Sequence, residues 1–381
     1  MTSPFLTLPG AVADSSGSVA AHYGEPVAEQ RMLAAGRAIV DLSDRGVVTV
    51  TGEDRLRWLD SLTSQSIAHL APGSSAETLL LDPQGRLEHS MRLVDDGTTT
   101  WLLLDGEQAA PLAAWLDRMR FMMQVEVVDV SAEWATLGQL SGADVDGAGG
   151  ALLVSAAAPH DVPLVWRDPW TAVQEGGWQY AASAEHPGGA FPAAEILVAR
   201  DELSMLADRA RADEFAVAGT LALEALRIAA WRPRQATEAD ERTIPHELDW
   251  MRSAVHLAKG CYRGQETVAK VHNLGHPPRR LVLLHLDGSA GVLPGEGSIV
   301  LNGDKEVGTV TSSARHHELG PIGLAVVKRT LDPQAPLVVR VDEEGESPAE
   351  LVAAAQEVIV PVEAGATAGV PRMPRLGAVQ R

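Results

Sequence analysis

The chain has 381 residues, of which 45% are hydrophobic and 22% are charged, as is typical of globular proteins with buried cores. One core seldom keeps growing at this length, so we expect two or three domains. The net charge of −20 disfavours non-specific binding to DNA or to acidic membranes. Because no apolar run approaches the ~20 residues of a membrane-spanning helix, a helical membrane protein is not expected.

Two further features bear on the compartment. No basic residue precedes the apolar part of segment 1–9, so a secretory signal is not expected. Cys261 is the single cysteine, which rules out an internal disulfide and is typical of a reducing environment. We therefore expect a cytoplasmic protein.

The first third of the chain mixes helical and strand patterns. Ser, Gly and Ala are abundant in residues 1–20, which are expected to be flexible. Helical spacing and period-two alternation of apolar residues then predict the following elements. They are helices over 29–40, 52–70 and 108–122, and strands over 46–51, 78–82, 86–94, 99–104 and 125–130. This order favours an α+β fold over a regular βαβ alternation.

A second α+β unit is expected to begin at 134–140. A loop rich in Gly, Ala and Asp over 141–150 interrupts it, and helices are predicted over 193–210 and 215–230. The second helix should end at Trp231-Arg-Pro-Arg234, because proline cannot continue a helix.

The C-terminal part changes to short strands separated by turns, which predicts a small closed β-barrel over 279–362. Residues 363–381, rich in Gly, Ala, Pro and Arg, are expected to be flexible. The predicted strands are 281–286, 298–301, 306–312, 322–327, 337–341 and 357–362.

The cysteine lies in the octapeptide Lys259-Gly-Cys-Tyr-Arg-Gly-Gln-Glu266. Glycines on either side of Cys261 allow backbone conformations closed to other residues, or a close approach to a ligand. Fixed positive charge at Lys259 and Arg263 would stabilise a thiolate. A lone cysteine is more often a small buried hydrophobe, but the polar surroundings favour a reactive role. Cys261 is therefore the candidate catalytic residue.

The octapeptide resembles the motif of the YgfZ family, folate-binding relatives of the glycine-cleavage T-protein. That family is associated with maintaining iron–sulfur enzymes and, in bacteria, with some tRNA modification. Segments 41–46, 226–231, 244–250 and 308–312 are also similar, so the likeness covers nearly the whole chain. It implies a T-protein-like multidomain α+β fold with a central folate-sized cavity. The implied domains are a folate-binding region over 21–275, formed by two intertwined subdomains (46–130 and 131–275), and the barrel over 279–362.

The resemblance also implies tetrahydrofolate or a derivative as the ligand and Cys261 as the reactive group. Gln265 and Glu266 would hydrogen-bond the ligand or the backbone, and Arg227 would help to order the site. The expected ligand-binding residues are Arg227, Trp231, Glu247, Lys259, Gly260, Tyr262, Arg263, Gly264, Gln265 and Glu266.

Two departures from the T-protein pattern argue against a glycine-cleavage aminomethyltransferase. The aspartate that activates bound folate has no counterpart in 85–89, where Glu88 or His89 would have to substitute. The glutamate that recognises the pterin in an Arg-Leu-Glu segment is replaced by Ala229. Losing that carboxylate would weaken folate binding, unless Glu247 or Glu266 took the acceptor role.

Metal chemistry is constrained by the single thiol. Iron–sulfur clusters usually take four protein ligands, so no integral cluster is expected, although contact with a partner's cluster or one shared across a dimer stays open. A zinc site from Cys261, His272 and His276 is another alternative, but Gly275 and two following prolines favour a loop there.

Six basic residues and one acid, Glu266, lie within 252–280. They indicate either a local anionic ligand or cations paired with acids elsewhere. Three functions are open. The favoured one is an accessory protein that serves iron–sulfur client or assembly proteins. The others are a folate-dependent aminomethyltransferase or demethylase, and a module for tRNA-modification enzymes that uses this basic segment. The basic residues are Arg252, Lys259, Arg263, Lys270, Arg279 and Arg280.

Overall fold

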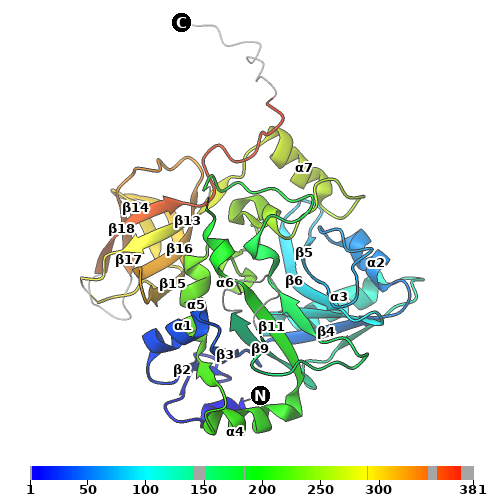
Figure 1. The fold of residues 1–381 in the computed structure, drawn as a ribbon. Helices are drawn as coiled ribbons and strands as arrows, with labels where there is room; N and C mark the ends of the chain where they lie inside the picture. Colours follow the sequence, from blue (N-terminus) through cyan, green and yellow to red (C-terminus); the bar gives the residue numbers. More distant parts are fainter. Residues whose placement is uncertain (1, 141–150, 184, 290, 342–349, 370–381) are drawn as a thin grey trace, which may run out of the picture.

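The computed structural model describes residues 2–140, 151–183, 185–289, 291–341 and 350–369. Two five-stranded sheets form the body of the molecule, and a closed six-stranded barrel lies beside them (Figure 1). None of the helices in these ranges is both long enough and apolar enough to cross a membrane. The loop expected over 141–150 lies outside the described residues.

The first sheet has the order β5-β6-β7-β4-β8, with all neighbours antiparallel. One face is covered by α2 (Arg55–Leu62) and α3 (Ala109–Met119), whose apolar residues join a single buried cluster with the sheet. The predicted strands are confirmed, whereas α2 is shorter than the predicted helix. The strands are β4 (Gly46–Thr51), β5 (Ser75–Leu81), β6 (Leu87–Asp95), β7 (Thr99–Leu104) and β8 (Glu126–Asp129).

The second sheet has the order β10-β11-β9-β3-β12, in which only the β3–β12 pair is parallel. One face packs against α4 (Leu203–Arg211) and the N-terminal segment. The other face packs against the first sheet and, toward β3, against α1 (Pro26–Ala34) and α5 (Thr220–Ala229). The strands are β3 (Ala38–Asp41), β9 (Trp134–Leu140), β10 (Val165–Arg167), β11 (Ala193–Ala199) and β12 (Ala216–Ala218).

Three predicted helices were wrong in part, because each contains a strand. The range 29–40 holds the end of α1 and then β3, 193–210 holds β11 and then α4, and 215–230 holds β12 and then α5. Strands β3 and β11 are buried almost throughout, so their sequences lack period-two alternation. Packing on both faces here overrides the helix propensity of alanine-rich runs. Gly36, with φ of 69°, lies between α1 and β3 and ends the helix.

The predicted closed barrel is confirmed, with the order β13-β16-β15-β14-β17-β18. Helix α5 packs against β15 and β16 and so joins the barrel to the body (Figure 1). The last strand is not 357–362 but begins earlier, in an alanine-rich run that has little strand propensity. The strands are β13 (Arg279–Leu286), β14 (Ile299–Asn302), β15 (Lys305–His316), β16 (Gly320–Lys328), β17 (Leu337–Val341) and β18 (Glu350–Val358).

The described parts of both termini are packed on the body, so the prediction of flexible ends was wrong there. Phe5 and Val19 are fully buried. At the other end, the backbone N–H groups of Thr367 and Ala368 donate to carbonyls of residues 272 and 273. These carbonyls lie in the last turn of α7 (Gln265–Leu274), where a helix lacks its own donors. Residues 370–381 lie outside the described residues.

Candidate functional site

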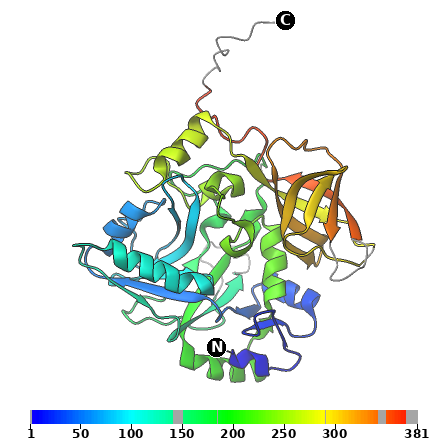
Figure 2. The same ribbon diagram turned by 180° about the vertical axis from the view of Figure 1, so that it is seen from behind.

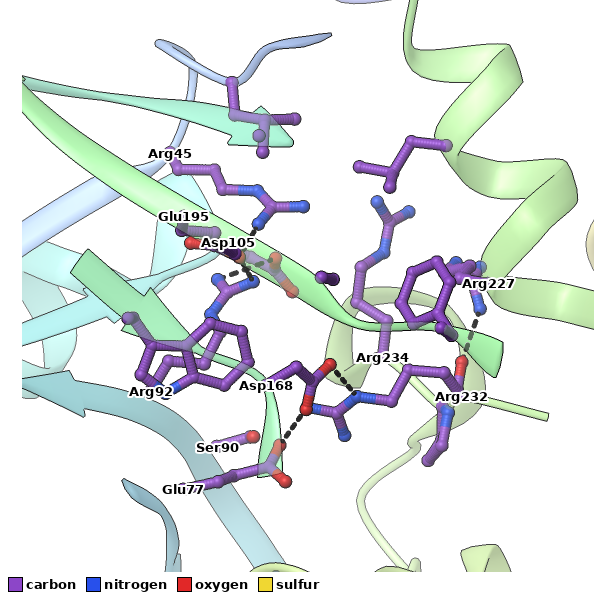
Figure 3. Close-up of a pocket in the computed structure, with 18 of the residues that line it drawn as sticks. Arg45, Glu77, Ser90, Arg92, Asp105, Asp168, Glu195, Arg227, Arg232 and Arg234 are labelled. Carbon is purple, nitrogen blue, oxygen red and sulfur yellow. Dashed lines mark hydrogen bonds and ion pairs between the residues drawn. The ribbon is translucent and has the colours of Figure 1, made fainter. Parts of the chain in front are cut away.

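A pocket lined by charged and apolar side chains lies between the two sheets and is closed by α5 and the segment that follows it (Figure 3). It encloses about 700 Å³ of space outside protein atoms, its open mouth included. Its apolar surfaces come from Leu42, Trp166, Phe191, Leu223 and Trp250.

The pocket is lined by equal numbers of positively and negatively charged side chains. Each buried charge needs an opposite partner, and equal numbers of both signs leave the pocket without net charge. A neutral polar ligand therefore suits it better than a multiply charged one. The lining cations are Arg45, Arg92, Arg227, Arg232 and Arg234, and the lining carboxylates are Glu77, Asp105, Asp168, Glu195 and Glu224.

Glu195 on β11 has an acceptor to spare. Alternation along the strand places its side chain on the same face as Leu197, toward the first sheet. Its Oε1 atom accepts from Arg45 and, at 2.8 Å, from Nη1 of Arg92 (Figure 3). Its buried Oε2 atom has no hydrogen-bond partner. Because an unpaired buried acceptor is costly, this oxygen can gain free energy by accepting from a ligand.

Arg232 has an unpaired hydrogen-bond donor. Its Nε atom donates to Asp168 at 2.9 Å and its Nη2 atom donates to Glu77 at 2.8 Å, while its buried Nη1 atom has no partner. The Nε atom of Arg234 also lacks one. The pocket thus offers unpaired donors as well as the unpaired acceptor on Glu195 (Figure 3).

Of the expected ligand-binding residues, Arg227 alone lines this pocket. It is held by Glu224 at 2.6 Å and by Glu238 at 3.1 Å. Burial opposes ionisation of Glu224, but Arg227 and Arg234 outweigh it and hold the pKa of that carboxyl at about 2. Both partners therefore stay charged at neutral pH, and Arg227 is fixed in place.

Trp231 and Glu247 do not line this pocket. Glu247 is fully buried and accepts from the guanidinium of Arg279 at 2.8 Å and from its backbone N–H at 3.1 Å. Its acceptor capacity is used, so it does not replace the missing pterin carboxylate. Trp231 packs edge-on against His186, with ring centroids 5.2 Å apart.

Ala229, where the T-protein pattern has a glutamate, does not line the pocket either. It packs instead against the apolar cluster beneath α5. Glu195 is the lining carboxylate that has an unpaired oxygen. The sequence did not predict it as a site residue, because the pattern over 193–210 predicts a helix. The available signal was a single glutamate inside the otherwise apolar run of β11.

Cys261 is exposed, and the two cations beside it pair with other groups. Nζ of Lys259 donates to the carbonyl oxygens of Asp60, Thr63 and Gln65 at 2.7–2.9 Å, around the C-terminal end of α2. Arg263 forms an ion pair with Glu88 and lies over the ring of Trp115, 5.6 Å from its centroid. These contacts fix the cysteine loop, and no ion pair within the described residues joins either cation to the thiol.

The rest of the octapeptide is structural or exposed. Gln265 donates to the carbonyls of Lys259 and Gly260 at 3.2 and 3.3 Å, which confirms the expected backbone contact. Gly264 has φ of 84°, and a Cβ there would lie 2.6 Å from the carbonyl oxygen of Asp82, so glycine is required. The ring of Tyr262 is buried, whereas Gly260 and Glu266 are exposed. None of residues 259–266 lines the pocket.

Strand β6 nevertheless links the cysteine loop to the pocket. Glu88, Ser90 and Arg92 alternate along it and share one face, on which Ser90 and Arg92 line the pocket. Glu88 pairs with Arg263, so it is not a free general base. His89 lies on the opposite face, where burial lowers the pKa of its imidazole and keeps it neutral. Neither residue is therefore a free carboxylate that faces the pocket.

The basic segment 252–280 does not form a cationic surface. Arg252, Arg280 and the Lys259 side chain are buried. Arg279 is paired with Asp240 at 2.6 Å and with Glu247 at 2.8 Å. Three of the six cations, Lys259, Arg263 and Arg279, thus pair with acids elsewhere in the fold, as the second of the two expected arrangements requires.

The zinc alternative is not supported. Nδ1 of His272 lies 2.9 Å from the hydroxyl of Tyr180, and Nδ1 of His276 lies 2.8 Å from the carbonyl oxygen of Ala364. Across the described parts of the chain, no group of three His, Cys, Asp or Glu residues is placed to hold a metal ion.

Asp249, beside the site, should make stability depend on pH. It is buried, with Oδ1 accepting from the N–H of Tyr180 at 2.6 Å and Oδ2 unpaired, 4.0 Å from Nε2 of His186. Burial, only partly offset by Arg252, raises its pKa to about 7. The folded state therefore binds this proton more tightly than the unfolded state, whose aspartate pKa is ~3.9, and stability falls as pH rises from about 4 to about 7.

Asp249→Asn should remove that decline and be more stable than wild type above pH 7, by on the order of 2 kcal/mol. Asparagine keeps the shape and tolerates the left-handed backbone, where φ is 55°. Urea unfolding from pH 4 to pH 8 measures the difference, with the exposed Asp304→Asn as the control. Parallel pH profiles for wild type and Asp249→Asn would show that this carboxyl does not titrate in the window.

Two segments of this chain match known domain families. Residues 20–146 match the GCVT N-terminal domain, and residues 279–355 match the glycine cleavage T-protein C-terminal barrel domain. The crystal structure of glycine cleavage system aminomethyltransferase T from Bartonella henselae has a TM-score of 0.69 and 17% sequence identity, covering 93% of this chain and 96% of that one. The predicted T-protein-like fold with a C-terminal barrel is confirmed.

Three curated relatives are 25–26% identical to this chain. A putative chloroplastic transferase, At1g60990 of Arabidopsis thaliana, is 26% identical over 309 residues, which are 77% of this chain and 66% of that protein. An aminomethyltransferase of Streptomyces coelicolor is 26% identical over 324 residues, with 80% and 82% covered. The iron–sulfur cluster assembly factor IBA57 homolog, mitochondrial, of Mycosarcoma maydis is 25% identical over 253 residues, with 63% and 55% covered. The chain is thus T-protein-like, with a GCVT N-terminal domain and a glycine cleavage T-protein C-terminal barrel domain.

Proposed function

We propose that this protein is a YgfZ-like, folate-binding accessory factor of the cytoplasm that helps to assemble or repair iron–sulfur enzymes. Tetrahydrofolate or a derivative would occupy the pocket between the two sheets, and Cys261 would be the reactive group. The observation that carries the proposal is the unpaired, buried Oε2 of Glu195 in a pocket lined by equal numbers of arginines and carboxylates.

The pocket chemistry suits a pterin. A pterin ring is neutral and presents N–H donors beside ring nitrogen and carbonyl acceptors. Oε2 of Glu195 would accept from an N–H group of the donor edge, since Oε1 already accepts from Arg45 and Arg92. The unpaired N–H groups of Arg232 and Arg234 would donate to the acceptors.

Catalysis of one-carbon transfer is the second candidate, favoured by the aminomethyltransferases among the relatives, which are 23–27% identical. It needs a carboxylate that is free to act as a base. In the pocket, Glu77 and Asp168 are both bound to Arg232, and outside it Glu88 is bound to Arg263. A transferase would therefore have to use Glu195 or Asp105. We prefer the accessory role because Glu195 already balances Arg45 and Arg92. Formation of methylene-tetrahydrofolate from a methylamine donor would reverse that preference.

The iron–sulfur half of the proposal rests on the octapeptide and on the similarity to the IBA57 homolog of Mycosarcoma maydis. One thiolate cannot hold a resident cluster. A cluster would instead be cargo, met at the exposed Cys261 on a client or assembly protein. The closeness of the cysteine loop to strand β6 supports a link between cargo and pocket.

Cys261→Ser should abolish this role. In cells whose own copy is deleted, the activity of an iron–sulfur enzyme is expected to recover with wild type and to stay at the deletion level with Cys261→Ser. Serine keeps the size of the side chain but is not ionised at neutral pH, so it cannot act as a thiolate. The exposed Ser289→Ala is the control, and immunoblots must show equal protein levels. Full recovery with Cys261→Ser would mean that the thiol performs no essential chemistry.

A further inference from the structure

We infer that the pocket takes a folate with a single glutamate in preference to folates with poly-γ-glutamyl chains. This inference rests on the proposed function, because it concerns the charge of the ligand at the same site. The pocket is marked as a ligand site by Glu195, whose side chain is 7% exposed and whose Oε2 atom has no partner.

The pocket opens beside an acidic depression, with which it shares Asp105 and Gln235. Four carboxylates line the depression, and its lining residues, all of them described, include no lysine or arginine. They come from the turn after β7 and from the segment after α6 (Gln235–Glu238). The four carboxylates are Asp105, Glu107, Asp240 and Glu241.

Nearby cations only partly offset this charge. Arg279 holds Asp240 at 2.6 Å, and Arg92 lies 3.7 Å from Asp105 deeper in the pocket. Glu107 is exposed, and the 83% exposed side chain of Glu241 has only a 3.7 Å contact with Arg242. The depression therefore remains negative at the place where a ligand tail would emerge.

The pocket borders a second depression, with which it shares Arg45. That depression contains two cations, but both are committed. Arg45 is paired with Glu195, and Arg200 donates to the carbonyls of Ser43, Ser131 and Trp134 at 2.9–3.0 Å. Neither opening thus presents an uncommitted cation among its lining residues to hold a chain of carboxylates.

The consequence concerns the tail of the folate. With the pterin in the pocket, a glutamate that leaves past Asp105 and Gln235 would enter the acidic depression, and each further γ-linked glutamate would add one negative charge there. At a separation of about 10 Å, repulsion from the uncompensated carboxylates is expected to weaken binding roughly threefold per added glutamate at low salt. Salt at 0.5 M should screen most of this difference.

The test compares tetrahydrofolate carrying one, three or five glutamates, titrated against the intrinsic tryptophan fluorescence of the full chain at 50 mM and 500 mM salt. For wild type at low salt, the triglutamate should bind about tenfold more weakly than the monoglutamate. The double variant Glu107→Gln, Glu241→Gln should reduce this difference in affinity, whereas the exposed barrel variant Glu296→Gln should leave it unchanged.

Equal or tighter binding of the triglutamate by wild type would overturn the inference while leaving the proposed function intact. A difference in affinity between the monoglutamate and the triglutamate that neither salt nor the double variant reduces would also overturn the inference, because the acidic depression would not be the cause of that difference. If none of the three ligands binds, the proposed function itself fails, and the inference fails with it.

Discussion

Glu195→Gln is expected to weaken tetrahydrofolate binding by roughly 10- to 100-fold, as the loss of one charge-assisted hydrogen bond in a desolvated site predicts. Glutamine keeps the shape of the side chain but replaces one carboxylate oxygen with an N–H donor. It also leaves Arg45 and Arg92 without their shared anion, so the pocket gains a positive charge. Isothermal titration with the monoglutamate would measure the change.

The control for this variant is Glu202→Gln, an exposed glutamate that follows β11. Since the loss of an anion between two arginines also destabilises the fold, thermal unfolding must show that Glu195→Gln is folded at the temperature of the titration. A folded variant with wild-type affinity would mean that Glu195 does not face the ligand. The acceptor role would then have to come from another lining carboxylate, and Asp105 at the mouth is the least committed one.

The sequence predicted short strands that are bounded by turns, including strands that are buried on both faces. Strand β7 and its neighbours were found because their runs are short, rich in Val, Leu and Thr, and bounded by turns. Strand β11 was not found, since its run of Ala, Glu, Ile, Leu and Val also suits a helix. Because a helix was predicted there, nothing in the sequence indicated that Glu195 lies opposite β6, and Glu195 was not predicted as a site residue.

The pocket could not be assembled from sequence spacing at all. Its arginines come from a turn before β4, from β6, from α5 and from the segment after α5, so only the folded chain brings them together. The cysteine loop shows a different limit. The sequence identified its unusual residues correctly, but it could not reveal that Lys259 is bound by three backbone carbonyls. Local charge predicts a local electrostatic effect only when that charge has no other partner.

Glu77→Ala is expected to destabilise the protein by about 3–5 kcal/mol, the range found when one partner of a buried ion pair is removed. Glu77 is 1% exposed and accepts three hydrogen bonds, from Arg232 at 2.8 Å, from Nε1 of Trp250 at 3.0 Å and from the hydroxyl of Ser253 at 2.7 Å. Alanine leaves all three donors without this acceptor, and Arg232 retains only Asp168 as an anionic partner.

Urea unfolding followed by tryptophan fluorescence would measure this loss, with Glu357→Ala on an exposed barrel position as the control. The stability of Glu77→Gln should lie between the stabilities of Glu77→Ala and Glu357→Ala. An amide oxygen can still accept one hydrogen bond, but it carries no charge to balance Arg232. Glu77 also connects the pocket to the segment that leads into the cysteine loop, through Trp250 and Ser253. If Glu77→Ala unfolds at the wild-type urea concentration, Asp168 alone must balance Arg232, and this connection contributes nothing to the stability of the site.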